Sequence, residues 1–185
     1  YQAIAMEVSS HGLEQGRLAG VNFNGAIFSN LTRDHLDYHG DMATYGAAKA
    51  RLFNWPDLEF AIINLDDDFG AELAKSSSCE QVIYYGRAEG AHLKFGFEKI
   101  HSQGMAIRFD WQGQALSTEL PLYGEFNAYN VAAALACVLQ MGFEFSLAVK
   151  ALQVLNGVPG RMQQVSASTG QPLVLVDYAH TPDAL

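Results

Sequence analysis

The chain has 185 residues, of which 49% are hydrophobic and 17% charged, and its formal net charge is −9 at pH 7. This length is enough for one sizeable core, or for one domain and part of another, and the composition is that of a globular rather than a disordered chain. The acidic balance argues against a general nucleic-acid binder, because phosphate backbones are held by clustered lysine and arginine. It is compatible with a negatively charged small substrate, since a helix N-terminus or a metal ion makes a local site positive.

The two cysteines, Cys79 and Cys137, lack metal-ligand spacing, and this usage predicts a reducing cytoplasm. No apolar run approaches the ~20 residues that span a bilayer. The sequence opens at residues 1–6 on what reads as a strand already under way, and residues 181–185 begin a helix that stops within its first turn. Since so short a helix is unstable alone, the sequence predicts a fragment of a longer protein.

Strand and helix patterns alternate in the first half of the chain, which is typical of βαβ units and a mainly parallel sheet. The run over 60–64 is nearly all apolar, as expected of a parallel strand covered on both faces. The predicted strands are 3–8, 25–28, 60–64 and 81–85, and the predicted helices are 13–18, 43–53 and 69–75.

The second half begins with three strand patterns separated by turn residues, which predicts an antiparallel meander attached to the parallel sheet. These strands are 93–100, 105–111 and 115–120, followed by helices over 126–141 and 146–155 and strands over 162–167 and 173–178. The breaker at 157–160 predicts a domain boundary. We therefore expect an α/β domain over 1–156, and a linker with the start of a second domain over 157–185.

The densest polar cluster follows the predicted strand 25–28 and contains two histidines and two aspartates within residues 34–39. Loops after the carboxyl ends of parallel strands carry ligands, and imidazoles beside carboxylates suit a divalent cation. The alternative is a polar loop that caps the next helix through Asp41 or Thr44. Glu7, at the end of an apolar strand pattern, is a second metal-ligand candidate, because a buried carboxylate is costly without a cation. The alternative role for Glu7 is that of an acid at a helix N-terminus, where it interacts with the helix dipole.

Other polar residues carry weaker signals. Lys49 reads as a solvated lysine on a helix face. Asn127 and Asn130 share the first turn of a predicted helix, where their amides could contact a base, although the residues alone favour capping by Asn127. Asp177 at a strand end could bind a ribose hydroxyl, and Arg161 could bind phosphate, although both also fit ordinary turns. The sequence contains no Gly-x-x-x-x-Gly-Lys-[Ser/Thr] phosphate loop.

Taken together, these segments resemble the Mur ligase family, and within it the branch known as MurE. Two stretches are specific to that branch: Glu-Val-Ser-Ser-His-Gly-Leu at residues 7–13 and Asp-His-Leu-Asp-Tyr-His-Gly at residues 34–40. Five further stretches match in family order, at residues 45–49, 63–68, 124–130, 160–162 and 176–185.

The resemblance implies an enzyme of three domains, which bind the UDP group, ATP and the incoming amino acid. This chain would hold most of the P-loop NTPase-like central domain and the first strands of a Rossmann-like C-terminal domain. The phosphate loop would precede residue 1, and the motif that selects the amino acid would follow residue 185. The implied full-length enzyme is a cytoplasmic monomer with no nucleic-acid or membrane partner.

The resemblance also implies roles for single residues. Glu7 and His35 match the family's magnesium ligands, with His35 also counted as catalytic. Lys49 matches the lysine that CO2 carbamylates to give a further carboxylate-like ligand. This implied role replaces the interpretation of Lys49 as a solvated lysine on a helix face. Asp34, Asp37 and His39 are expected only to support these ligands. The remaining matches are Ser9, Gln15 and Arg17 for the UDP-MurNAc-dipeptide, Asn127 and Asn130 for adenine, Arg161 for the nucleotide across the domain junction, and Asp177 for ribose.

The implied reaction belongs to peptidoglycan precursor synthesis. ATP would phosphorylate the D-Glu carboxylate of UDP-MurNAc-L-Ala-D-Glu, and the amine of meso-diaminopimelate would displace the phosphate, with Mg2+ neutralising charge. A lysine-adding enzyme, another Mur ligase and a folylpolyglutamate synthase remain as alternatives within the family. Outside it, a metal-dependent phosphohydrolase and a non-catalytic binding module remain. The ligase reading predicts that the isolated chain is inactive.

Overall fold

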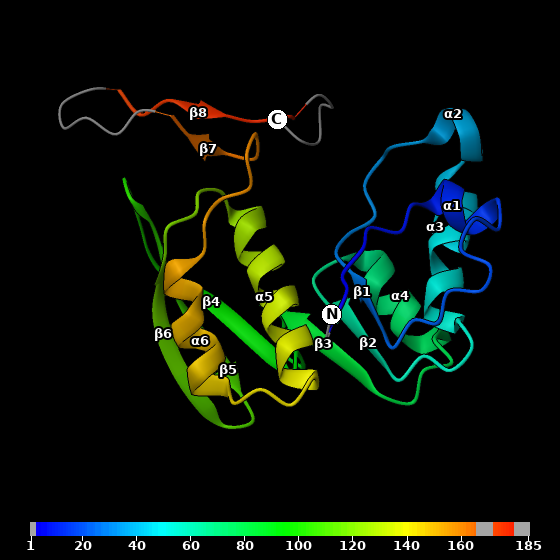
Figure 1. Ribbon diagram of the computed structural model, residues 1–185, viewed down its shortest axis with the longest axis horizontal. Helices are drawn as coiled ribbons and strands as arrows, with labels where there is room; N and C mark the ends of the chain where they lie inside the picture. Colours follow the sequence, from blue (N-terminus) through cyan, green and yellow to red (C-terminus); the bar gives the residue numbers. More distant parts are fainter. Residues whose placement is uncertain (1–2, 166–171, 180–185) are drawn as a thin grey trace.

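A computed structural model describes residues 3–165 and 172–179 of the chain. Within them, six strands form one mixed sheet in the order β1-β2-β3-β4-β5-β6, and helices cover both of its faces (Figure 1). A separate two-stranded sheet, β7-β8, follows (Figure 1). The predicted α/β fold with a mixed sheet is therefore confirmed.

The parallel part of the sheet is formed by β1 (Gly25–Phe28), β2 (Phe60–Asn64) and β3 (Val82–Gly86). Gly25 pairs with Phe60, and Ala61 pairs with Val82, both in parallel register. Helical segments connect these strands, as the alternating sequence pattern predicted. They are α2 (Leu36–His39), α3 (Met42–Ala50) and the 3-10 helix η1 (Arg51–Asn54) before β2, and α4 (Asp68–Ser76) after it.

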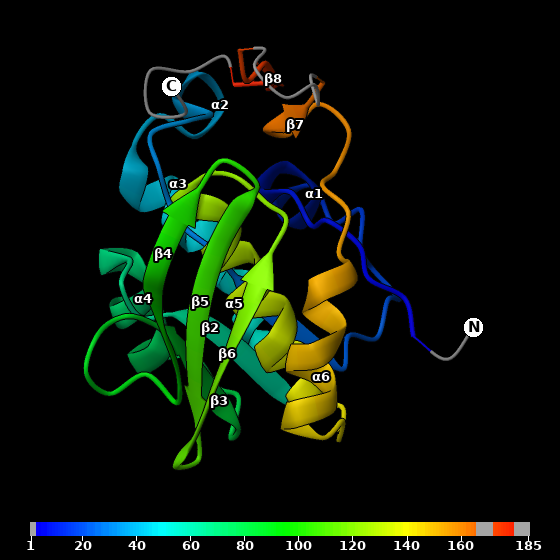
Figure 2. The ribbon, with the colours of Figure 1, turned by 90° about the vertical axis from the view of Figure 1, so that its left-hand side faces the viewer.

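The antiparallel part is formed by β4 (Leu93–His101), β5 (Gly104–Trp111) and β6 (Gln114–Leu120), which confirms the predicted meander (Figure 2). A two-residue turn joins β5 to β6, and both Gln112 and Gly113 have positive φ, of 49° and 79°. This is the backbone that a tight hairpin turn of matching twist requires. The meander joins the parallel strands through a short parallel pairing of β3 with β4.

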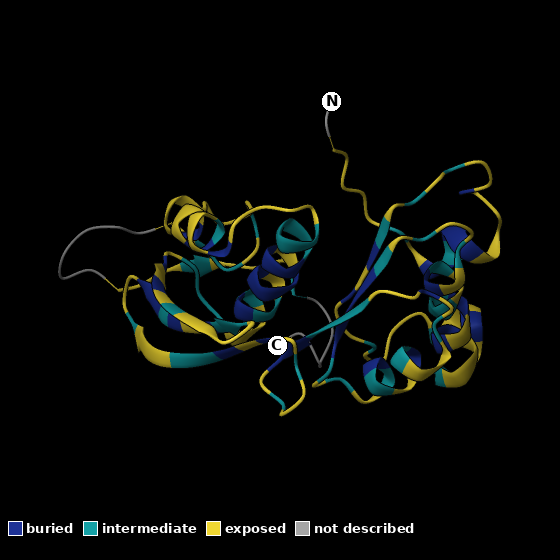
Figure 3. Cartoon of the chain, turned by 90° about the horizontal axis from the view of Figure 1, so that it is seen from below, coloured by how far each residue is buried: buried dark blue, intermediate teal, exposed yellow. Residues whose placement is uncertain are grey.

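Two hydrophobic clusters lie on opposite faces of the sheet. Ile62 belongs to the larger cluster, whereas its neighbours Ala61 and Ile63 belong to the smaller one, because successive side chains of a strand point to opposite faces. The larger cluster is covered by α5 (Glu125–Gln140) and α6 (Phe145–Ala151), which continues as the 3-10 helix η2 (Leu152–Val154). Figure 3 shows how the buried residues line the helix faces that meet the sheet.

Residues 3–8 contradict the prediction of a buried strand. They form no strand, and Ile4 and Met6 are exposed by 81% and 53%. The pattern is apolar, but a strand also needs hydrogen bonds to a neighbouring strand. Residues 3–8 make no such pairing with the outer edge of β1, which is the outermost strand of the sheet that the described residues form. The predicted helix at 13–18 is also displaced: α1 is Ser10–Glu14, and it ends before Gly16, whose φ is 67°.

The end of the chain is only partly described. β7 (Gln163–Gln164) and β8 (Leu175–Val176) pair in antiparallel register, so the two predicted strands exist in shortened form. The predicted turn at 168–170 and the helix start at 181–185 lie outside the described residues. The domain division at 156/157 and the Rossmann-like nature of the second part stay predictions. No helix among the described residues is long and apolar enough to cross a membrane, and the cytoplasmic location also stays a prediction.

Candidate functional site

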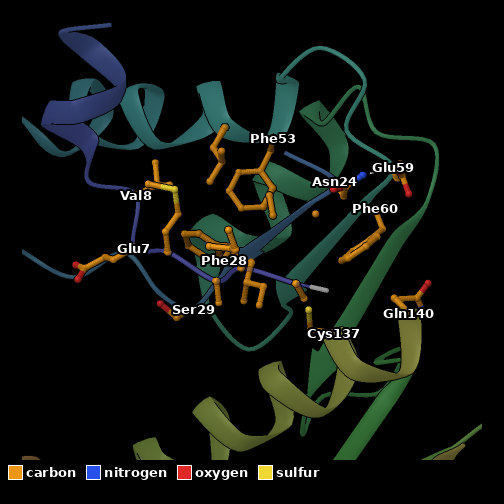
Figure 4. Close-up of a pocket in the computed structure, with 18 of the residues that line it drawn as sticks. Glu7, Val8, Asn24, Phe28, Ser29, Phe53, Glu59, Phe60, Cys137 and Gln140 are labelled. Atoms are coloured by element: carbon orange, nitrogen blue, oxygen red, sulfur yellow. Dashed lines mark hydrogen bonds between the residues drawn. The ribbon is translucent and has the colours of Figure 1, made fainter. Parts of the chain in front are cut away.

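A cavity of about 1050 Å3 lies between residues 3–8, strand β1 and the end of α5. Glu7 and Ser29 lie on one side of it, and Phe60 and Gln140 lie on the other (Figure 4). Asn30 and Lys49 line it as well. Polar residues line the cavity at both ends of β1, and Glu7, Ser29, Asn30 and Lys49 lie toward the carboxyl end of the strand, which is the end of a parallel sheet at which ligands bind.

Lys49 lies on the last turn of α3 and is half-buried. Burial lowers the pKa of its ammonium group, and the negative charges of Glu7 and Asp34 act against this lowering. The structure thus brings Glu7, Asp34 and Lys49 into one electrostatic neighbourhood, although they are far apart in sequence. It contradicts the interpretation of Lys49 as a solvated lysine, since that interpretation considered the helix alone and not the segments that bury the side chain. It also contradicts the expectation of a buried carboxylate at Glu7, which is exposed.

His35 occupies an unusual backbone conformation at the start of α2, with a φ of 56°. Its backbone N–H donates to Asp34 Oδ1 at 2.7 Å, and its half-exposed ring lies edge-on to the rings of His11 and Tyr45. A non-glycine residue in the left-handed region costs about 1 kcal/mol or more. Such strain, observed beside the Lys49 neighbourhood, is typical of functional positions.

His39 is fully buried and connects α1 with α3. Its Nε2 lies 2.9 Å from Ser10 Oγ, and its Nδ1 lies 3.3 Å from Glu14 Oε2 without hydrogen-bond geometry. Its ring stacks on Tyr45 at a centroid distance of 5.2 Å. The centroid of the Tyr45 ring in turn lies 5.1 Å from Lys49 Nζ, so these rings pack against a residue that lines the cavity.

The alternative interpretation of residues 34–41, as a polar loop that caps the next helix, is also confirmed. Asp41 Oδ1 accepts a hydrogen bond from Thr44 N at 2.7 Å and so caps α3.

The described residues contain no group of three or more histidine, cysteine, aspartate or glutamate side chains placed to hold a metal ion. Glu7 and His35 therefore supply too few ligands by themselves. Conversion of the Lys49 amine to a carbamate would add a carboxylate-like ligand to the wall of the cavity that Glu7 also lines. Glu7 and Lys49 line the same cavity and would supply two such ligands, whereas His35 is not among its lining residues, so the three-residue magnesium site stays a prediction.

The three residues expected to contact the UDP-linked substrate flank α1: Ser9 precedes it, and Gln15 and Arg17 follow it. Ser9 Oγ accepts from Gly12 N at 3.1 Å, so it caps the helix, and Gln15 Nε2 donates to Tyr38 Oη at 3.0 Å. Arg17 is exposed. Ser9 and Gln15 are thus partly engaged in local structure, and Arg17 presents its guanidinium to solvent.

Asn127 and Asn130 lie on one face of the first turns of α5, as their spacing predicted. Asn130 Nδ2 donates to Asn127 Oδ1 at 3.4 Å, and Asn127 Nδ2 donates to the carbonyl of Tyr123 at 2.7 Å. Gly124, not Asn127, is the N-cap residue, and it makes no side-chain cap. The capping alternative for Asn127 is therefore wrong in its usual form. Its amide instead fixes the chain that enters the helix.

Arg161 and Asp177 come together in the segment of β7 and β8. Asp177 accepts from Met162 N and Ala179 N, each at 2.7 Å, and the Arg161 guanidinium lies 5.4 Å from the Tyr178 ring centroid. The carboxylate of Asp177 therefore connects the residues just before β7 with those just after β8. A turn role is confirmed for it, and the ribose role stays a prediction.

Two residues of evident importance were given no role from the sequence. Asp66 and Asp67 follow β2, and their carboxylates accept hydrogen bonds from four separate parts of the chain. The run of three aspartates at residues 66–68 was the available signal. Its partners, however, lie up to 63 residues away and cannot be read from spacing.

Comparison with known proteins settles the family. Residues 1–138 match the family described as Mur ligase middle domain. The chain belongs to the Mur ligase family. The UDP-N-acetylmuramoyl-L-alanyl-D-glutamate--2,6-diaminopimelate ligase of Pseudomonas aeruginosa is 46% identical over 100% of this chain and 38% of its own length. The ligase of the same name from Neisseria meningitidis serogroup A is 47% identical over 98% of this chain and 37% of its own.

Solved structures agree with this assignment to the Mur ligases. A structure of UDP-N-acetylmuramoyl-L-alanyl-D-glutamate--2,6-diaminopimelate ligase is 39% identical, with a TM-score of 0.81 over 96% of this chain and 37% of that one. The MurF ligase of Thermotoga maritima in complex with ADP has a TM-score of 0.73 at 18% identity, over 96% of this chain and 40% of that one. The second likeness shows the fold alone. This Mur ligase chain thus spans about 38% of the length of its curated relatives.

Proposed function

We propose that this chain forms the central, ATP-binding part of a carbon–nitrogen ligase that adds meso-diaminopimelate to UDP-MurNAc-L-Ala-D-Glu. The observation that carries the proposal is that Glu7 and the half-buried Lys49, from separate segments, line the same cavity beside β1. The whole-chain identity to ligases of that name supports the choice of substrate. The ADP in a fold relative supports the use of a nucleotide.

Glu7, His35 and carbamylated Lys49 would hold magnesium. When bound, the ion would neutralise the charge that develops as a phosphoryl group is transferred. The chain's own residues prepare this arrangement. The half-buried position of Lys49 favours the neutral amine, which is the form that reacts with CO2, and the Tyr45 ring packs against its side chain. The catalytic role of Lys49 rests on this placement, and that of His35 on its contact with the same Tyr45 ring.

The reaction proceeds in two steps. An oxygen of the D-Glu carboxylate attacks the γ-phosphorus of ATP, which gives an acyl phosphate and ADP. The amine of diaminopimelate then attacks the acyl carbon, a C–N bond forms, and the C–O bond to phosphate breaks as the amine loses its proton. Ser9, Gln15 and Arg17 would bind the UDP-linked substrate. Asn127 and Asn130 would contact adenine, and Arg161 and Asp177 would contact the nucleotide from the C-terminal part.

A substrate panel on the full-length ligase that carries this chain tests the proposal. We expect ADP formation that depends on both UDP-MurNAc-L-Ala-D-Glu and meso-diaminopimelate, with amide product detected by mass spectrometry. A preference for L-lysine would overturn the choice of amino acid and leave the ligase assignment intact. Hydrolysis of phosphate esters without amide formation would overturn the ligase assignment itself.

A further inference from the structure

Segment 64–67, which follows β2, contacts the loop that leads from β1 toward His35. The buried Asn64 donates from Nδ2 to the carbonyl of Ser29 at 2.7 Å. Asp67 Oδ2 accepts from the backbone N–H of Leu31 at 3.0 Å, while its Oδ1 accepts from Gly70 N and caps α4. We call residues 29–35, which lead from β1 to His35, the metal-side loop. These bonds fix its first residues against the end of β2.

The same segment contacts α5 through Asp66. The Asp66 carboxylate accepts from Arg87 N at 2.6 Å, from Ala88 N at 2.8 Å and from Tyr129 Oη at 2.8 Å. Tyr129 lies between Asn127 and Asn130 in the sequence of α5. One carboxylate therefore connects the end of β2, the loop after β3 and the first turns of the helix that carries both asparagines.

The surroundings of Asp66 are shaped to hold it. Gly86 has a φ of 151°, and a Cβ at that position would lie 2.8 Å from Asp66 Oδ1, so only glycine fits there. Arg87 Nη1 lies 2.6 Å from Glu125 Oε1, which adds a second contact to α5. Desolvation, followed by the hydrogen bond to Asp66, raises the pKa of Tyr129 to about 12, so its hydroxyl keeps the proton that it donates.

We propose that segment 64–67 is a positioning element that sets the adenine end and the metal end of the nucleotide site relative to each other. This inference rests on the proposed function. Asp66 acts on adenine recognition through Tyr129, and Asp67 acts on the metal-side loop through Leu31. Both are positioning residues that contact neither substrate nor metal, and because they are adjacent in sequence, a shift of one end is transmitted to the other.

Tyr129→Phe in the full-length ligase tests the adenine end. It removes one hydroxyl and leaves the ring packed edge-on against Phe95. Loss of a hydrogen bond to a carboxylate should raise KM for ATP about fivefold to tenfold and leave kcat and KM for the UDP-linked substrate nearly unchanged. The preference for ATP over GTP should fall as well, because a displaced pair of asparagines reads the base less well. A purely structural role would not change this preference.

Tyr84→Phe is the matched control. Tyr84 lies on β3, its ring stacks on His92, and its hydroxyl makes no hydrogen bond seen among the described residues. It should behave as the parent does. Asn127→Ala, measured in parallel, separates the two hypotheses. If Asn127→Ala weakens the preference for ATP and Tyr129→Phe does not, the positioning role is wrong and the adenine role stands. If neither has an effect, both are wrong.

Asp67→Ser tests the metal end. Serine is also a good N-cap residue, so α4 stays capped, but its shorter side chain cannot reach Leu31 N as well. Binding of Mn2+, used as a probe for Mg2+ and measured by electron paramagnetic resonance, should weaken about tenfold. Asp68→Ser, at the exposed neighbouring acid, is the control and should bind Mn2+ as the parent does. Unchanged Mn2+ binding by Asp67→Ser would overturn this half of the proposal, and so would a parent that binds no Mn2+.

Discussion

The Lys49 region and the start of α5 form two ends of one proposed site, but different interactions place them. Around Lys49, the helices α1, α2 and α3 have only 5, 4 and 9 residues. Rings pack them together: Tyr45 contacts His35, His39 and Lys49, and His39 reaches Ser10 of α1. Helix α5, by contrast, has 16 residues, and its apolar face packs into the larger core.

This difference determines what a mutation should do at each end. Helices as short as α1 and α2 are unstable alone and depend on tertiary packing. Removing a ring that packs them should therefore change stability and the site together. Helix α5 is stabilised by its core contacts, so removing a contact of its first turn should change ligand affinity with little effect on unfolding. The two ends can be compared by measuring both quantities for each variant.

The largest effect is expected for Lys49→Ala. The variant removes both the amine that would be carbamylated and a metal ligand, so ligase activity should fall about 100-fold or more. The unfolding temperature should change little, because the side chain is only half-buried. Ligase assays and thermal unfolding of the full-length protein check both expectations. Lys75→Ala, at the last turn of α4, is a matched control with an exposed lysine. Retained activity in Lys49→Ala would remove the basis of the metal site.

A smaller effect, on both stability and activity, is expected for His39→Ala. The change leaves a cavity beside Tyr45 and removes the hydrogen bond to Ser10, so unfolding should become easier by about 2–4 kcal/mol. Denaturant unfolding measures the loss. Ser10→Ala removes only the hydrogen bond and should cost about 1 kcal/mol. If His39→Ala were as stable as the parent, the picture of a region packed by rings would be wrong.

The smallest effect concerns the cap of α3. The hydrogen bonds from Thr44 lower the pKa of Asp41 below its ordinary 3.8, so the cap stabilises the folded chain fully above that pH and is lost as the pH falls below it. Asp41→Asn also caps well but does not titrate. At neutral pH the variant should unfold as the parent does, and its stability should fall less on acidification. Circular dichroism across the acid range measures this. Parallel acid curves would contradict the role of Asp41.

Local features were predictable from sequence wherever local chemistry decides them. The apolar run of β2 and the turn residues of the meander specify their elements at close range. The run at residues 3–8 has the same apolar character as β2 but no strand partner among the described residues, and pairing is not a local property. Likewise, the burial of Lys49 depends on acids that other segments supply. The Asp66–Tyr129 contact joins residues 63 positions apart, which no spacing rule reaches.

His35 shows how stability and activity select different residues at one position. Its backbone has a φ of 56°, which glycine adopts without strain and histidine does not. Relief of this strain, about 1 kcal/mol, should offset the ring contacts with His11 and Tyr45 that His35→Gly would lose, so a screen for thermostable variants should accept the change. The same variant would delete the imidazole that the proposed magnesium site needs. A melting temperature would thus not register the loss of the residue that marks the site, so position 35 has to be scored by turnover.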